Sequence, residues 1–74
     1  MTRPGVYLHH KGGRYSVLFV ATDTTNGVNC GRRMVVFVSL MTGEAHTRRE
    51  TQFHETVRVT AGGSGVPRFK LIEE

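Results

Sequence analysis

The sequence predicts an all-β domain, a small SH3-like barrel of five to six short strands with one helical turn before the fifth strand. Six short segments either alternate between apolar and polar residues or are rich in β-branched and aromatic residues. Tight turns separate them, and no segment has the length of a helix that could pack on a sheet. The 74 residues suffice for one domain, residues 1–74, in which barrel closure would remove the exposed strand edges.

The first two predicted strands form a hairpin. Residues 5–10 contain the strand formers Val6 and Tyr7, and the next strand covers residues 14–22. Gly12 and Gly13 between them favour a two-residue type I′ turn, which needs a positive φ at both positions. Alternation along the second strand places one set of side chains on a common face: Tyr15, Val17, Phe19 and Ala21.

The middle of the chain contains a long hairpin loop and two further strands. Residues 24–31 are rich in Thr, Asn and Gly, which is typical of a loop. Residues 34–40 form the second strong strand, and a turn at 41–44 leads to a weak strand over residues 45–48. Residues 49–54 lack a two-residue period and are too few for a stable α-helix, so they predict the single helical turn.

The last two strands flank a glycine-rich connection. Residues 56–60 alternate between polar residues and valine, and residues 61–65 have the composition of a flexible linker. Residues 66–72 form the final strand, with Phe69 and Leu71 on one face. Pro67 cannot donate a hydrogen bond to a neighbouring strand, so this strand is expected to begin on an edge.

Composition limits the function classes. Ten Lys and Arg residues against six Asp and Glu residues give a formal charge of +4, which favours an anionic partner such as a nucleic acid or nucleotide. No apolar run approaches the roughly 20 residues that span a bilayer, and the first residues do not resemble a signal peptide. We therefore expect a cytoplasmic protein without membrane contact, either a monomer or a homodimer.

The residues that could carry chemistry do not form a reactive set. His9 and His10 are adjacent on a strand and should point to opposite faces, so we expect no metal site and no other cofactor. Cys30 lies in the glycine-rich loop, where nothing would hold it against a base. The carboxylates are scattered rather than paired. The sequence therefore predicts a binding protein and not an enzyme.

Basic residues cluster at turns and strand ends. In a small barrel they can converge on one rim with tyrosine and histidine rings between them, an arrangement suited to phosphate pairing and base stacking. The alternative is a set of solvated charges spread over the surface. The positions concerned are Lys11, Arg14, Arg32, Arg33, Arg48 and Arg49.

Several motifs in order resemble the domain of unknown function 1653 family of short bacterial and phage proteins. Its opening Tyr-x-His-aromatic-Lys-Gly-x-x-Tyr-x-Val matches residues 7–17, and its Val-Val-Tyr matches residues 35–37 with Phe37 for tyrosine. Its Trp-Val-Arg-Pro corresponds to residues 46–49, where this chain keeps Arg48 but has His46 for tryptophan and Arg49 for proline. Its closing Val-Pro-Arg-Phe is present at residues 66–69.

The resemblance implies a compact β fold and brings no established activity. The basic excess and the hairpin at Lys11 and Gly12 favour a module that binds an anionic ligand, a nucleic acid or a nucleotide. The alternative is a protein-interaction domain that captures a peptide in an aromatic groove or at an exposed strand edge, dependent on Tyr7 or Tyr15. The candidate ligand-binding residues are His9, Lys11, Tyr15, Arg48 and Arg68.

Overall fold

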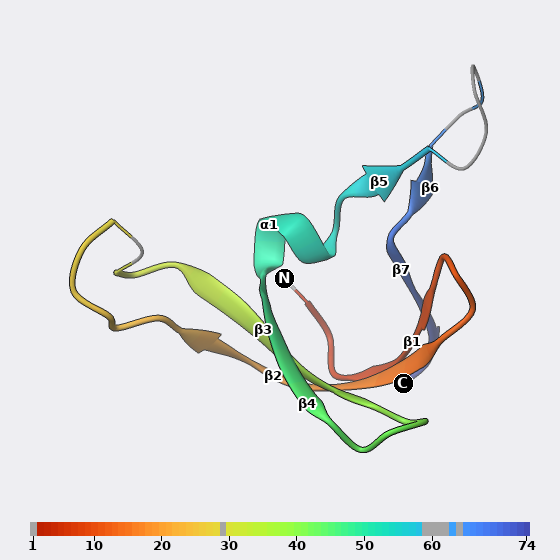
Figure 1. The fold of residues 1–74 in the computed structure, drawn as a ribbon, viewed down its shortest axis with the longest axis horizontal. Helices are drawn as coiled ribbons and strands as arrows, with labels where there is room; N and C mark the ends of the chain where they lie inside the picture. Colours follow the sequence, from red (N-terminus) through yellow and green to blue (C-terminus); the bar gives the residue numbers. More distant parts are fainter. Residues whose placement is uncertain (1, 29, 59–62, 64) are drawn as a thin grey trace.

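A five-stranded antiparallel sheet forms most of the structure, which is a computed structural model that describes residues 2–28, 30–58, 63 and 65–74. The strand order is β4-β3-β2-β1-β7, so the first four strands form a meander and β7 returns to pair with β1 (Figure 1). A helical turn, α1 (Glu50–Phe53), and a two-stranded pair, β5 (Thr56–Val57) with β6 (Val66–Pro67), lie between β4 and β7 in the chain. The five strands of the sheet are β1 (Gly5–His9), β2 (Arg14–Thr22), β3 (Arg33–Ser39), β4 (Ala45–Arg49) and β7 (Phe69–Glu73).

The mostly-β class and the helical turn before β5 are as predicted, whereas closure into an SH3-like barrel is not confirmed. Among the described strands, β4 and β7 are the two edges of an open sheet. The predicted final strand divides at Arg68, whose N–H donates to the Glu55 carbonyl (2.8 Å) and whose carbonyl accepts from the His10 N–H (3.0 Å). Its first part therefore pairs with β5 and its second part with β1, so no strand connects β4 to β7.

Two local predictions need correction. A β-bulge at Leu18 changes the register of β2 against β3, so that Val17 pairs with Phe37 but Phe19 pairs with Val36. Phe19 consequently lies outside the core, 55% exposed, and Val20 packs against the core in its place. The turn after β1 is not type I′, because of the two glycines only Gly12 has a positive φ (+103°).

Most other predictions along the chain agree with the described residues, but His9 and His10 do not point to opposite faces, because β1 ends at His9 and the two ring centroids are 4.3 Å apart. Residues 24–28 and 30–31 lie outside strands, as expected for the loop between β2 and β3, and this hairpin projects away from α1 (Figure 1). The predicted strand over residues 56–60 is present as β5, but its residues 59 and 60 lie outside the described residues. Asn29 of the loop, and residues 61, 62 and 64 of the predicted linker, also lie outside them.

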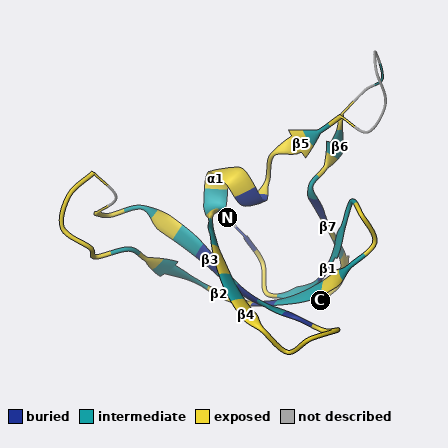
Figure 2. Ribbon diagram, viewed as in Figure 1, coloured by how far each residue is buried: buried dark blue, intermediate teal, exposed yellow. Residues whose placement is uncertain are grey.

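The core lies on one face of the sheet, which we call the inner face. Strand alternation places the buried side chains of β1, β2, β3 and β7 on this face, and α1 adds Phe53 over them (Figure 2). The Phe53 ring stacks on Phe69 with centroids 4.3 Å apart and an interplanar angle of 3°. The buried apolar residues are Tyr7, Val17, Val35, Phe37, Phe53 and Phe69.

The N-terminal segment is attached to α1 by polar contacts. The Thr2 N–H and hydroxyl both donate to the Glu50 carboxylate, at 2.9 and 2.8 Å, and the same hydroxyl lies 2.7 Å from His54 Nε2. These bonds hold α1 over the core. In the part of the chain that the structure describes, no helix has the length and apolar character needed to cross a membrane.

Candidate functional site

A small cavity opens on the inner face between β4 and the aromatic residues of β1, β2, β3 and β7, and we call it the aromatic pocket. Its volume is about 190 Å³. Strand pairing builds it: Phe37 is opposite His46 and Val35 is opposite Arg48, so alternation turns both β4 side chains toward the inner face. The lining residues are His9, Tyr15, Phe37, His46, Thr47, Arg48 and Phe69.

Aromatic rings form most of the pocket wall. His46 stacks on Phe37 with centroids 5.5 Å apart and an interplanar angle of 28°. Tyr15 meets both Phe37 and Phe69 edge to face at 5.5 Å, and His9 meets Phe69 in the same way at 4.9 Å. Each ring is thus oriented by a neighbour, and a planar ligand would meet a rigid surface.

Three of the five predicted site residues line this pocket, namely His9, Tyr15 and Arg48. Lys11 does not line it; it is exposed in the β1–β2 turn, where its backbone N–H donates to His9 Nδ1 at 3.1 Å. Arg68 does not line it either, because its guanidinium lies 3.6 Å from Glu55. The Nε of Arg68 is buried and has no hydrogen-bond partner among the described residues.

The surroundings of His9 alter the pKa of its imidazole. Burial lowers the pKa of the His9 imidazole below its ordinary value, which favours the neutral ring. Positive charges nearby lower this pKa further: His10, Arg68, Lys11 and Arg48. In the neutral ring, Nδ1 is the acceptor for the Lys11 N–H, which leaves the proton on Nε2.

This shift predicts a dependence of stability on pH. The unfolded chain binds the His9 proton more tightly than the folded chain, so the free energy of unfolding should fall as the pH is lowered through about 6.5, toward the lower folded-state pKa. The free energy of unfolding of the His9→Asn variant should decrease less over the same pH range. Urea unfolding at several pH values between about 8 and 5 measures this free energy for both proteins. Parallel pH profiles for the two proteins would contradict the assignment.

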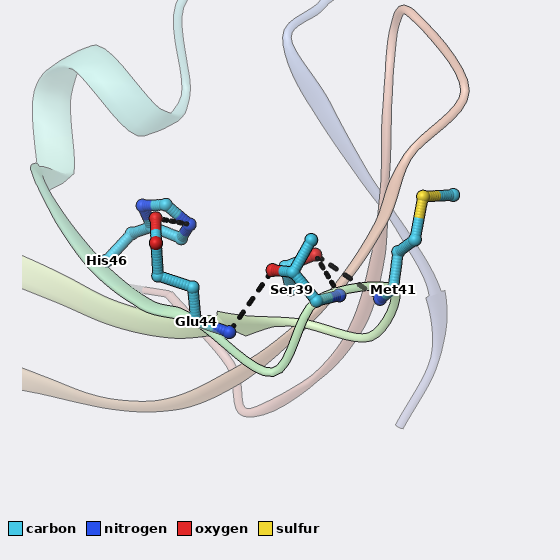
Figure 3. A network of polar contacts seen from close by, with 5 residues as sticks. Ser39, Met41, Glu44 and His46 are labelled. Carbon is cyan, nitrogen blue, oxygen red and sulfur yellow. Dashed lines mark hydrogen bonds and ion pairs between the residues drawn. The ribbon is translucent and has the colours of Figure 1, made fainter.

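His46 lines the pocket, and the β3–β4 turn that precedes its strand is held by a network of polar contacts (Figure 3). The Ser39 hydroxyl accepts from the N–H groups of Met41 (3.3 Å) and Thr42 (3.2 Å), and the Ser39 N–H donates to the Glu44 carbonyl (2.9 Å). Glu44 extends from this turn to His46, with 3.4 Å between its carboxylate and Nε2.

The family model described as protein of unknown function (DUF1653) matches residues 5–71. The chain belongs to the DUF1653 family. The crystal structure of a DUF1653 protein from Bordetella bronchiseptica is 31% identical, with a TM-score of 0.79, over 96% of this chain and 87% of that chain. No curated protein matches.

This chain departs from the DUF1653 motif at His46 and Arg49, and the two residues line different cavities. His46, in the place of tryptophan, retains a ring that stacks on Phe37. Arg49, in the place of proline, follows Arg48 on β4 and lines a separate cavity with Arg32 and Arg33. Arg14 lines a third cavity, beside Leu40. The basic residues predicted to share one rim are therefore divided among several surfaces.

Sequence reasoning missed two rings of the aromatic pocket in this DUF1653 protein, Phe37 and Phe69, whereas His46 had been considered as one of the rings between the basic residues. Alternation along the strands could have placed each on the inner face, but only the pairing of β3 with β4 brings His46 to Phe37. Cys30 is exposed, and the described residues contain no group of three or more His, Cys, Asp or Glu residues placed to hold a metal.

Proposed function

We propose that this DUF1653 protein is a non-catalytic cytoplasmic binding module for an anionic ligand, a nucleic acid or a nucleotide. The observation that carries the proposal is the presence of His9, Tyr15 and Arg48 in one cavity. The guanidinium of Arg48 supplies a bidentate donor for a phosphate, and the surrounding rings supply faces for a base.

The charges near the pocket support an anionic ligand. Burial is the largest cause of the lowered pKa of His9, and the positive charges of Lys11, Arg48 and Arg68 lower it further. An anion bound there would be attracted by all three. Arg68 is partly compensated by Glu55, and Lys11 is exposed, so Arg48 is the cation that we expect to contribute most.

The size of the pocket limits what it can enclose. Small-molecule sites usually measure about 300–1,000 Å³, whereas the aromatic pocket measures about 190 Å³. We therefore propose that it takes one base or one sugar-phosphate unit, with the remainder of the ligand along the rim.

The decisive test is the Arg48→Gln variant, titrated with a fluorescent single-stranded oligonucleotide and with nucleoside monophosphates at low salt. Loss of one charged hydrogen-bonding group costs about 1.5–3 kcal/mol, so affinity should fall about 10- to 100-fold. Tyr15→Leu should weaken binding to a similar extent through lost stacking.

Arg14→Gln is the matched control, because Arg14 precedes Tyr15 in β2 and so points to the opposite face of the sheet. It removes the same charge and should leave affinity nearly unchanged. Flat titrations of the unmodified protein with DNA, RNA and nucleotides would refute the proposal, and equal losses in both arginine variants would refute the role of the pocket.

The open sheet favours one alternative, a protein-interaction domain that adds a peptide strand at an exposed edge. The edges are β4 and β7. Of the two rings first considered, Tyr7 is 4% exposed and donates its hydroxyl to the Arg3 carbonyl, so only Tyr15 is available to a partner. Peptide capture predicts binding that persists in high salt, whereas nucleic-acid binding weakens steeply.

A further inference from the structure

A second basic cavity lies where the start of β3, the end of β4 and the start of α1 meet, and we call it the arginine pocket. Its volume is about 290 Å³. Arg49 reaches it because Met34 and Arg49 are paired across β3 and β4, which brings the end of β4 beside the start of β3. Its lining residues are Arg32, Arg33, Arg49, Glu50 and Thr51.

The positive charge of the arginine pocket exceeds its negative charge. Three guanidinium groups line it against the single carboxylate of Glu50. Hydrogen bonds from Thr2 and the charge of Arg33 hold the pKa of Glu50 below its usual range, so this carboxylate is ionised at neutral pH. It already accepts two hydrogen bonds from Thr2, at 2.9 and 2.8 Å. The lining therefore has a formal charge of +2.

None of the three arginines forms an ion pair with a carboxylate of the described residues. Arg32 is close enough to Asp23 to contribute to the lowering of its pKa, but hydrogen bonds from Thr25 are the larger cause. The Asp23 carboxylate accepts the Thr25 N–H at 2.8 Å. The guanidinium groups of this pocket are thus without acidic partners in that part of the chain.

One guanidinium nitrogen of Arg32 is also unpaired. Its Nη1 atom is buried and has no hydrogen-bond partner among the described residues. An oxyanion in the pocket would pair with the guanidinium groups that line it and neutralise the excess charge. Tetrahedral phosphate suits this role, since guanidinium groups pair with it through two parallel hydrogen bonds.

We infer that the arginine pocket is a phosphate-binding site formed by Arg32, Arg33 and Arg49. It is separate from the aromatic pocket, because Arg48 and Arg49 are consecutive on β4 and point to opposite faces. The inference does not depend on the proposed function. The phosphate can belong to the free anion, to a monoester or to a nucleic-acid backbone, and all three have the same oxygen chemistry.

The test is an NMR titration of the arginine Nε–H resonances with inorganic phosphate, against sodium chloride of equal ionic strength. We expect Arg32, Arg33 and Arg49 to shift with a common saturating curve and Arg14 to follow the chloride control. Arg32→Gln and Arg49→Gln should each weaken phosphate binding at least tenfold. Arg32→Lys keeps the charge but loses the planar donor pair, so it should give an intermediate loss.

One control variant separates this site from general electrostatics: Arg14→Gln should leave the phosphate curve of Arg32, Arg33 and Arg49 unchanged. The Nε–H resonance of Arg48, followed in the same titration, reports separately on the aromatic pocket. The same titration with a nucleoside monophosphate and with a single-stranded oligonucleotide shows which source of phosphate is preferred. Shifts no larger than those in chloride, or equal losses in the Arg14→Gln protein, would overturn the inference. Backbone amide spectra of each variant establish that it is folded.

Discussion

Replacement of Phe53 by alanine is expected to unfold a large fraction of the protein. The Phe53 side chain is completely buried and contacts the rings of Tyr7, Phe37 and Phe69. Truncation of a buried phenylalanine typically costs about 3–5 kcal/mol, and a chain of 74 residues has a stability of roughly 4–11 kcal/mol in total. The loss is therefore comparable to the whole stability at the lower end of this range and less than half of it at the upper end.

Urea unfolding followed by circular dichroism measures the effect, since the chain has no tryptophan to report on its core. The matched control is Phe19→Ala, the same chemical change at a side chain that is 55% exposed, which should change stability by about 0.5 kcal/mol or less. Phe53→Leu should retain most of the stability. A Phe53→Ala protein as stable as Phe19→Ala would show that α1 does not cover the core.

The second large effect is expected from Gly5→Ala. Gly5 has a φ of +148°, and a β-carbon built there would lie 2.5 Å from the Glu73 carbonyl oxygen. That oxygen belongs to the backbone of β7, which pairs with β1, so one of the two strands must move. We expect a loss of about 2–4 kcal/mol from steric overlap and backbone strain together.

Gly12→Ala separates the two causes. Gly12 has a φ of +103°, but a β-carbon there would meet nothing within 4 Å. This variant therefore reports backbone strain alone and should lose about 1 kcal/mol. The free energy of unfolding of both variants should be measured by the same urea titration. Equal losses at the two positions would mean that the contact with β7 is not the cause.

The candidate site was predictable only in part. His9, Tyr15 and Arg48 were identified from the basic excess, the turn chemistry and the resemblance to DUF1653, and they share one pocket. Lys11 and Arg68 were also identified, but they act on this pocket only through their charge. The guanidinium of Arg68 lies beside Glu55, which is 13 residues earlier in the sequence, and only the fold brings the two side chains together.

The sequence alone does not show which residues surround Arg48 and which surround Arg49. Arg48 and Arg49 are adjacent in the sequence, and both are basic strand-end residues. Strand alternation predicts that they point to opposite faces, but the neighbours on each face come from β3 and α1. Their surroundings are set by the pairing of Val35 with Arg48 and of Met34 with Arg49.

The sequence alone determined the elements that depend on local chemistry. Runs of β-branched and aromatic residues specified the strands, and the aperiodic residues before β5 specified the helical turn. Tertiary structure alone decided that the sheet stays open and that Phe19 faces outward. The bulge at Leu18 and the division of the last strand at Arg68 depend on hydrogen bonds between distant segments, which no local pattern records.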